Sequence, residues 1–213
     1  QSLEALVAHI PGLKVVMPST PYDAKGLLKA AIRDDNPVMF IEHKMQYKEK
    51  GPVPVEDYII PFGVADIKRP GKDLTIVTYS RMVLRALEAA DILAREGIDA
   101  EVIDLRTLAP LDIDTVITSI KKTGRFVGVT EAYENTSFIN EVMAQINELA
   151  FDWLDAPMVR VASANVPVPR AEVLEDQAIP NTNRIVEAWR VTAFSPAAAA
   201  ARAPRIRCAA RTA

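Results

Sequence analysis

Residues 74–110 constrain the fold more than any other stretch of the chain. Residues 74–79 form a short run of apolar and β-branched residues, and between Met82 and Leu93 the apolar residues recur at helical spacing. Gly97 ends this helix, and residues 100–105 form a second apolar strand. Two buried strands joined by a helix are typical of parallel pairing through a right-handed crossover, so the sequence predicts an α/β layered fold.

The composition argues against several classes of protein. With 49% hydrophobic and 25% charged residues, the chain has the balance of an ordinary globular protein. Its net charge of −3 argues against a nucleic-acid partner. The sequence contains no uninterrupted apolar stretch of about 18 residues, so no membrane span is predicted. Cys208 is the single cysteine, which fits a reducing compartment. Because the chain opens at Gln1, within a helical pattern, we expect it to be a piece of a longer protein.

The pattern divides the chain into two units. Residues 1–45 read as a partial strand–helix–strand unit, and the charged, proline-rich residues 46–72 as a linker that holds a short edge strand near residues 63–67. Residues 73–190 carry four further strands, enough for an independent core. Residues 191–213 contain ten Ala, four Arg and no acid, and we expect a disordered tail there; the alternative is a basic arm for an acidic partner.

The expected elements follow from the periodicity of the apolar residues. Ser2, Thr20 and Ser80 are the expected N-caps of three helices, and Pro21 suits the first helical position after Thr20. The expected helices cover residues 2–10, 20–33, 82–93, 112–122, 137–150 and 181–189. The expected strands cover residues 13–17, 38–41, 74–79, 100–105, 125–130 and 158–162.

Five segments, taken together and in order, carry a family resemblance. They are PGLKVVMPSTPYDAKGLLKAAIRDDNPVMFIEHK, VTYSR, EVIDLRTLAPLD, FDWLDAPMVRV and VPVPRAEVLEDQAIP. As a set they resemble the beta subunits of the 2-oxo acid dehydrogenases, the group that includes the pyruvate, branched-chain and acetoin enzymes. The resemblance implies a mainly parallel, three-layer domain of the transketolase C-terminal type over residues 73–190, preceded by a partial α/β fragment of a pyrimidine-binding domain.

The resemblance also implies an activity and its partners. Such enzymes decarboxylate a 2-oxo acid on thiamine diphosphate and pass the acyl group to a lipoyl arm of a dihydrolipoyl acyltransferase core. They are α₂β₂ heterotetramers, so the implied partners of this chain are an alpha subunit and a second beta subunit. The implied location is the bacterial cytoplasm or, in a eukaryote, the mitochondrial matrix. The family's catalytic glutamate precedes the segments matched here, so we assign this chain no catalytic or cofactor-binding residue and expect it to be inactive alone, with a role in assembly and active-site support.

Two other functions stay open on the sequence alone. One is a non-catalytic protein-interaction domain derived from the family. The other is a Rossmann-like nucleotide-binding module, which the absence of a G-x-G-x-x-G motif after residues 74–79 disfavours.

The turn before Pro37 is the best candidate for a ligand site. Carbonyl groups at a helix C-terminus carry partial negative charge, and the oxygens of Asp34 and Asn36 add further hard ligands for a cation. The resemblance implies a structural potassium ion held through the positions of Ala31, Ile32, Asp34 and Asn36. The alternative is an ordinary capped turn.

Three other sets of residues were candidates with simpler explanations. Glu131, Glu134 and Glu141 suggest paired carboxylates, but the two histidines, His9 and His43, lie in the other unit, so a role beside helix and strand ends is the preferred interpretation. An aromatic segment contains Phe151, Trp153 and Leu154. Two interpretations of it stay open, a contact between subunits and a place in the domain core. A solvated basic face is expected from Lys121, Lys122 and Arg125.

Overall fold

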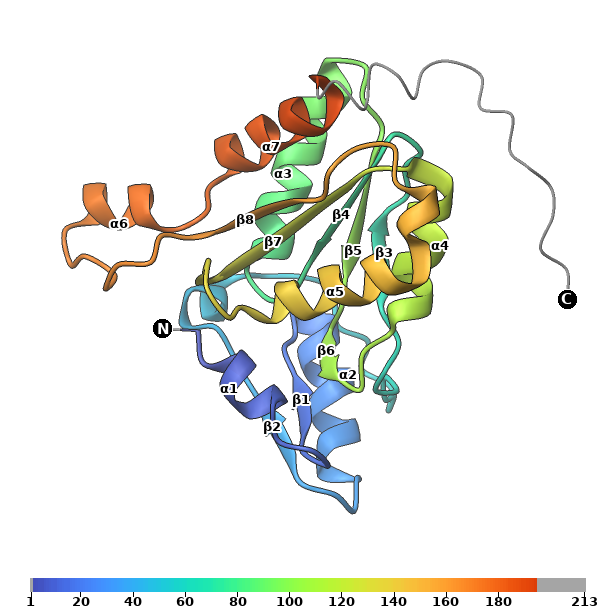
Figure 1. The fold of residues 1–213 in the computed structure, drawn as a ribbon. Helices are drawn as coiled ribbons and strands as arrows, with labels where there is room; N and C mark the ends of the chain where they lie inside the picture. Colours follow the sequence, from blue (N-terminus) through green and yellow to red (C-terminus); the bar gives the residue numbers. More distant parts are fainter. Residues whose placement is uncertain (1, 195–213) are drawn as a thin grey trace, which may run out of the picture.

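The computed structural model describes residues 2–194, and the larger of its two sheets has five strands (Figure 1). In spatial order these are β3 (Asp66–Arg69), β5 (Ala100–Asp104), β4 (Leu74–Thr78), β7 (Phe126–Tyr133) and β8 (Val159–Ser163). All neighbours pair in parallel except β3, which runs antiparallel to β5 at one edge. The chain moves from β4 to β5 on one side and later to β7 on the other, so the strand order reverses at β4.

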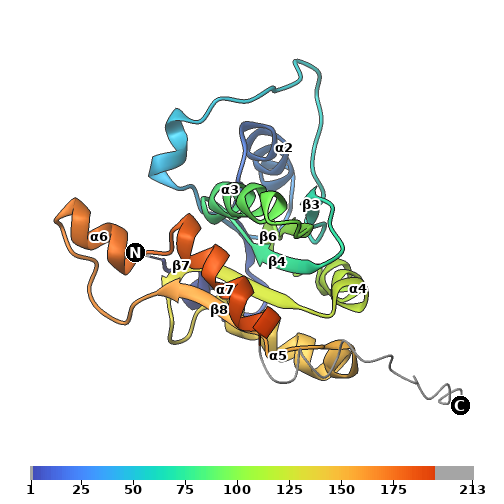
Figure 2. The ribbon, with the colours of Figure 1, turned by 90° about the horizontal axis from the view of Figure 1, so that it is seen from above.

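Helices cover both faces of this sheet and make the second unit three-layered (Figure 2). One face packs against α3 (Met82–Arg95) and α7 (Thr182–Phe194), and the other against α4 (Ile113–Thr123) and α5 (Phe138–Ala150). β4 and β5 are buried along their whole length because helices lie on both sides of them. The short helix α6 (Glu172–Ala178) projects away from these layers (Figure 1).

The first unit consists of residues 2–48 and lies against the carboxyl ends of the large sheet. It contains the helices α1 (Glu4–Ala8) and α2 (Pro21–Ile32), the 3-10 helix η1 (Lys44–Lys48) and the parallel strands β1 (Lys14–Val16) and β2 (Val38–Phe40). A third strand, β6 (Thr107–Ala109), leaves the second unit after β5 and pairs antiparallel with β1. The small sheet therefore contains residues from both units.

Residues 49–63 form a strap along α2. On one face of that helix Lys25, Lys29 and Arg33 follow each other at four-residue intervals. Lys25 donates hydrogen bonds to strap carbonyls, and Lys29 and Arg33 pair with Asp57. Gly26 allows the close approach, because a Cβ there would lie 2.6 Å from Ile60 Cγ1. The strap therefore closes a small core of its own around Val16, Leu27 and Ile60.

The α/β fold class and the alternation of strands and helices in the second unit are confirmed. The edge strand is confirmed in kind, although β3 covers residues 66–69 rather than 63–67. Four elements were not predicted: η1, β6, α6 and the 3-10 helix η2 (Phe151–Trp153). Each is short, so its residues do not span enough turns or pleats to give a period.

Three other predictions were wrong in detail. Leu3, rather than Ser2, occupies the N-cap of α1, and no side chain caps that helix. Ser80 does not cap α3: its φ is +54°, Arg81 is the N-cap, and the Ser80 hydroxyl lies 3.4 Å from Gln46. Residues 191–194 continue α7, so they do not belong to the predicted tail; the rest of that tail, residues 195–213, lies outside the described residues.

Thr20 caps α2 as predicted, since its hydroxyl accepts the N–H of Asp23, and Pro21 follows it at the first helical position. At the C-terminus of α4, Gly124 ends the helix in the left-handed conformation that glycine adopts at low cost. Across residues 2–194, no helix combines the length and the apolar character needed to cross a membrane.

Candidate functional site at the junction of the two units

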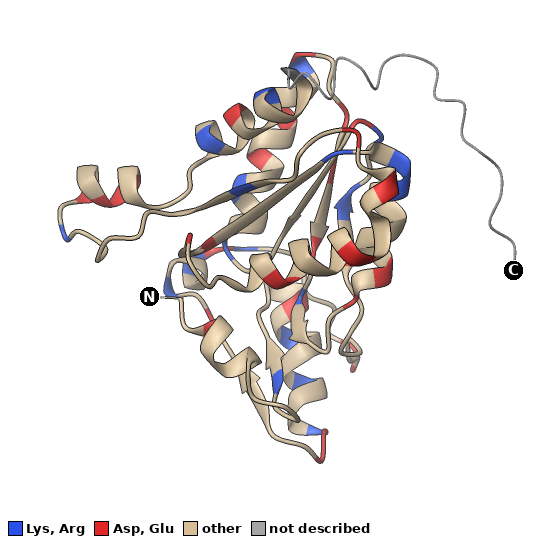
Figure 3. Cartoon of the chain, in the orientation of Figure 1, with Lys and Arg blue, Asp and Glu red and all other residues tan. Residues whose placement is uncertain are grey.

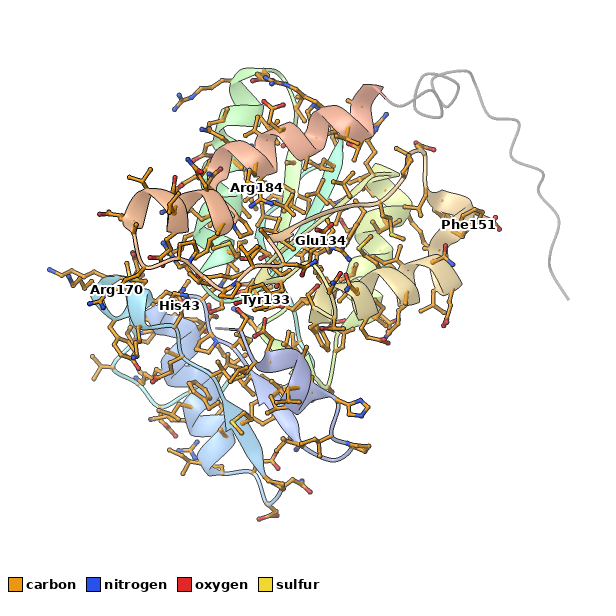
Figure 4. All side chains as sticks on the ribbon, turned by 60° about the vertical axis from the view of Figure 1, so that its left-hand side comes forward. His43, Tyr133, Glu134, Phe151, Arg170 and Arg184 are labelled. Carbon is orange, nitrogen blue, oxygen red and sulfur yellow. The ribbon has the colours of Figure 1, made fainter. Side chains whose placement is uncertain are left out.

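The first unit fills the crevice at the carboxyl ends of β4 and β7. In open α/β sheets a ligand binds at this place, where the strand order reverses. Here His43 Nε2 lies 2.8 Å from Glu131 Oε2 of β7, and Arg81 lies 3.4 Å from the other oxygen. Figure 4 labels His43 in the first unit. His43 Nδ1 accepts the Met45 N–H, so Nε2 carries the hydrogen that is donated to Glu131. At this place the structure therefore has a contact between the first unit, through His43, and the large sheet, through Glu131.

A buried chain of hydrogen bonds continues from this contact into α1. Tyr79 donates its hydroxyl hydrogen to Glu4 at 2.9 Å and lies 2.7 Å from the Thr130 hydroxyl, which in turn accepts the N–H of Ala132. Burial raises the pKa of Glu4 and raises that of Tyr79 well above its usual value. Burial is the largest single influence on Glu131 and would raise its pKa, but the hydrogen bond with His43 and the charges of His43 and Arg81 together outweigh burial and lower this pKa.

A second cluster, here called the junction cluster, lies where α2 meets β3 and β5. It contains Asp23, Asp66, Lys68, Asp104 and Arg106. Lys68 lies 2.7 Å from Asp23 and 2.8 Å from Asp66, and the Arg106 guanidinium lies 2.7 Å from each of the same two carboxylates. Asp23 and Asp104 are both 0% exposed, so most of this charge is removed from water. Charges buried in this way are tolerated only when paired.

The junction cluster also sets the local backbone. Arg106 adopts a φ of +58°, an uncommon conformation for a residue with a side chain, and its N–H donates to Asp104 at 3.0 Å. This turn directs the chain from β5 into β6 and so into the small sheet. The cluster and β6 therefore fasten the two units at the same place.

A cavity of about 210 Å³ lies beside the His43 contact, at the carboxyl ends of β1 and β2. Several of its polar groups are already engaged within the chain: Tyr47 donates to Glu42, and Gln46 donates to the Ser19 carbonyl. Its lining residues are Pro18, Ser19, Thr20, Pro21, Ala24, Glu42, His43, Gln46, Tyr47 and Glu49. In the described part of the chain, no group of three or more His, Cys, Asp or Glu residues is placed to hold a metal ion.

The predicted potassium turn lies at the far end of α2 from the junction. One Asp34 oxygen pairs with the Lys14 ammonium, and the other accepts the backbone and side-chain N–H groups of Asn36. These contacts, led by Lys14, lower the pKa of Asp34 to about 2. Because the carboxylate is engaged, a potassium ion here would rely on carbonyl oxygens, including those of Ala31 and Ile32, which suits a weakly hydrated cation at a helix C-terminus.

The three glutamates of the sequence analysis do not form one site. Glu131 lies near the end of β7, as expected, where it also bridges the two units, and Glu134 pairs with Arg160 at 3.2 Å. Glu141 lies in the first turn of α5, as expected for an acid near the positive end of a helix. Sequence reasoning missed the His43–Glu131 contact because the two residues are 88 positions apart in the chain.

The aromatic segment and the basic set each divide between two environments. Phe151 is 64% exposed, whereas Trp153 and Leu154 pack against the core of the second unit. The basic residues are not a simple solvated face: Lys122 pairs with the buried Glu101, and Lys121 and Arg125 lie over the rings of Trp153 and Trp189. Figure 3 shows the charged residues of both signs dispersed over the whole ribbon.

Comparison with known families explains this arrangement of two joined units. Residues 63–185, more than half of the chain, match the family described as transketolase, C-terminal domain. The chain belongs to the transketolase C-terminal domain family. Residues 1–50 match a second family, the transketolase pyrimidine binding domain, so the junction described above joins parts of two transketolase domains.

Several beta subunits are similar to this transketolase-family chain. The acetoin:2,6-dichlorophenolindophenol oxidoreductase subunit beta of Cupriavidus necator is 54% identical over 90% of the chain and 57% of its own length. Two Bacillus subtilis proteins follow: the 2-oxoisovalerate dehydrogenase subunit beta is 49% identical over 89% of the chain and 59% of its own length, and the pyruvate dehydrogenase E1 component subunit beta is 50% identical over 89% and 58%.

The chain thus spans somewhat more than half the length of these relatives. Among solved structures, a split-gene transketolase described as an inactive beta4 tetramer superposes with a TM-score of 0.72 at 23% identity, over 89% of this chain and 62% of that one. At that identity the likeness supports the transketolase fold alone.

Proposed function

We propose that this chain is part of the beta subunit of a thiamine-diphosphate-dependent dehydrogenase acting on a 2-oxo acid or on acetoin. The observation that carries the proposal is the identity of about 50% to three such beta subunits over nine-tenths of the chain. The described residues would support the active site, because their buried charges hold a pyrimidine-domain portion against the C-terminal domain. The cellular compartment would follow the source, since relatives include bacterial and mitochondrial proteins.

Thiamine diphosphate would be held mainly by other regions of the proposed enzyme. When bound, it supplies the electron sink for decarboxylation of a 2-oxo acid. The buried carboxylates of the first unit are committed elsewhere: Glu4 accepts from Tyr79, and Asp23 from Lys68 and Thr20. This chain's own contribution would be positional, through residues that fix α1 and η1 against the large sheet.

The proposed partners are an alpha subunit, a second beta subunit and a dihydrolipoyl acyltransferase core that receives the acyl group. Exposed apolar residues support such assembly. On α1 and its flanks Leu3, Leu6 and Ile10 lie on the side opposite the core, and Ile32 is 74% exposed at the end of α2. A second apolar patch, with Leu149 and Phe151, lies at the end of α5 beside an open cavity of about 580 Å³.

The test is reconstitution of the native protein that contains this sequence with the alpha subunit from the same source. Reduction of 2,6-dichlorophenolindophenol would be followed with thiamine diphosphate and, in turn, pyruvate, 3-methyl-2-oxobutanoate and acetoin. We expect turnover of at least one substrate that depends on both subunits. A native mass equal to the 23.4 kDa of this chain, with no turnover, would instead favour a non-catalytic protein-interaction domain derived from the family.

A further inference from the structure

The junction cluster contains one carboxylate more than it contains cations. Three carboxylates face two cations: Asp23 from α2, Asp66 and Lys68 from β3, Asp104 from β5 and Arg106 from the turn after it. The side chains of Lys68 and Arg106 are only 12% and 11% exposed. With every group ionised, this cluster would carry a net charge of −1 in a place largely removed from water, which is costly.

The cations do not divide evenly among the carboxylates. Both lie within 2.8 Å of Asp23 and Asp66, whereas Asp104 has Lys68 at 3.6 Å as its closest cation in the described structure. Asp104 otherwise accepts hydrogen bonds from the Arg106 N–H and the Ser19 hydroxyl. It is therefore the carboxylate whose charge is least compensated.

The Ser19 hydroxyl adds an independent geometric argument. Its oxygen contacts Asp104 Oδ2 closely and lies 3.2 Å from Asp23 Oδ2. A hydroxyl carries one hydrogen and can donate to only one of the two carboxylates. A second hydrogen between these groups would satisfy both contacts, and protonation of Asp104 supplies it.

Water has a route to the junction cluster. A cavity of about 590 Å³ opens between the strap and α2, and its walls include Asp66, Lys68, Arg106 and Ser19. Protons can therefore exchange with solvent without separation of the two units. Burial raises the pKa of Asp104 to about 6, because desolvation outweighs the opposing effects of Lys68 and Ser19.

We propose that the junction cluster is a proton-sensitive contact that takes up one proton on Asp104 in mildly acidic solution and docks the two units more tightly in that state. Once Asp104 is neutral, two carboxylates face two cations and the Ser19 hydroxyl has a partner on each side. This inference concerns the junction itself and does not depend on the catalytic assignment, so the two can fail separately.

The sign of the effect follows from linkage. A group whose pKa is raised in the folded chain contributes stability that is complete below its unfolded value, near 3.8, and is lost as the pH rises through about 6. Asp23 acts in the opposite direction, since hydrogen bonds from Lys68 and Thr20 overcome burial and lower its pKa, and its contribution is lost only below about pH 4. Glu4, whose pKa burial also raises, titrates in the same direction as Asp104, so a comparison with a variant at residue 104 isolates the contribution of Asp104 between pH 4.5 and 7.5.

The experiment compares the full chain with Asp104→Asn, which keeps the acceptor for Ser19 and Arg106 but cannot titrate. Between pH 7.5 and 4.5, we expect the unfolding equilibrium constant of the unmodified chain to fall by roughly 30-fold relative to that of the variant. Glu101→Gln is the matched control, since Glu101 is a buried carboxylate on the same strand with one cation, Lys122, as its partner. It should retain the pH dependence of the unmodified chain.

Hydrogen exchange locates the effect. In the unmodified chain, amides of α2 should gain protection relative to those of α4 at the lower pH, and this gain should be absent in Asp104→Asn. Equal pH dependence in the unmodified chain and Asp104→Asn would overturn the proposal. If Asp104→Asn does not fold, the carbon-13 titration of the Asp104 carboxyl in the unmodified chain decides: a midpoint above about pH 5 supports the proposal and one below it refutes it.

Discussion

At the scale of single residues, the hydroxyl of Tyr79 joins two elements that lie far apart in the sequence. It joins Glu4 of α1 to Thr130 of β7 inside the core, and the residue is only 3% exposed. A buried polar group that loses its hydrogen-bond partner destabilises the fold by its full desolvation penalty, so removal of such a link is costly. The same reasoning applies to Asp23, whose partners also come from elements distant in the sequence.

Replacement of Tyr79 by Phe should lower the free energy of unfolding by about 1–3 kcal/mol, because Glu4 and Thr130 would be left buried without this partner. Tyr47→Phe is the matched control: the Tyr47 hydroxyl also donates to a glutamate, but the residue is exposed, and its loss should cost less than about 0.5 kcal/mol. Urea unfolding of both variants measures the difference. Equal costs for the two variants would show that the buried link contributes nothing.

Individual site residues were the least predictable part of the molecule. Thr20 was found as a cap because its signal is local, whereas the partners of Glu131 and Asp104 come from elements far away in the chain. A weak signal did exist: Asp104 and Arg106 interrupt a run of apolar residues that reads as a buried strand. Charged residues in such a run must find partners, but the sequence does not say which ones.

At the scale of elements, α2 depends on the strap that runs along it. Gly26→Ala should destabilise the chain by about 1–3 kcal/mol, because the new Cβ would lie 2.6 Å from Ile60 Cγ1 and 2.8 Å from the Tyr58 ring. In the double variant with Ile60→Ala the clash with residue 60 is removed, so the two costs should not add. Thermal unfolding of the single and double variants tests this, and strict additivity would contradict it.

The C-terminal turn of α2 is where the predicted potassium ion can be tested. At equal ionic strength, KCl should stabilise the chain over NaCl by about 1–3 kcal/mol when the site is saturated. Asn36→Ala should weaken this difference, because the Asn36 side chain donates to Asp34 and helps to hold the turn that presents the carbonyl oxygens. Melting curves in the two salts measure it. An unmodified chain that melts identically in both salts would remove the case for an ion held by Ala31, Ile32, Asp34 and Asn36.

Elements were predicted where their periodic pattern was long enough to read. Helices such as α3 and α5 repeat their apolar residues over three or more turns, and β4 and β5 are buried strands in which most residues are apolar. β6 has three residues, and its position depends on a pairing with β1 that lies about 90 residues earlier in the chain. Tertiary pairing, rather than local preference, decides such an element.

At the scale of the whole molecule, the exposed apolar residues of the first unit point to assembly. Leu6 is 68% exposed on α1, and Leu6→Glu should weaken subunit association of the proposed enzyme by at least about tenfold while leaving the fold intact. Val55→Lys is the control, since Val55 is also an exposed apolar residue (94%) but lies on the strap and not on α1, so this change should not affect association if α1 forms the interface. Light scattering of the assembled protein over a dilution series measures both, and unchanged association of Leu6→Glu would exclude α1 from the interface.

The small sheet has a consequence for how the molecule can be divided. By sequence, β6 lies within the transketolase C-terminal domain, but its hydrogen bonds go to β1 in the pyrimidine binding domain. Excision at the family boundary would leave β1 and β6 each with an unsatisfied strand edge, and such edges recruit other chains. The two portions therefore match separate families yet share one sheet, and a recombinant exchange of either between relatives must carry residues 107–109 together with the strand that they complete.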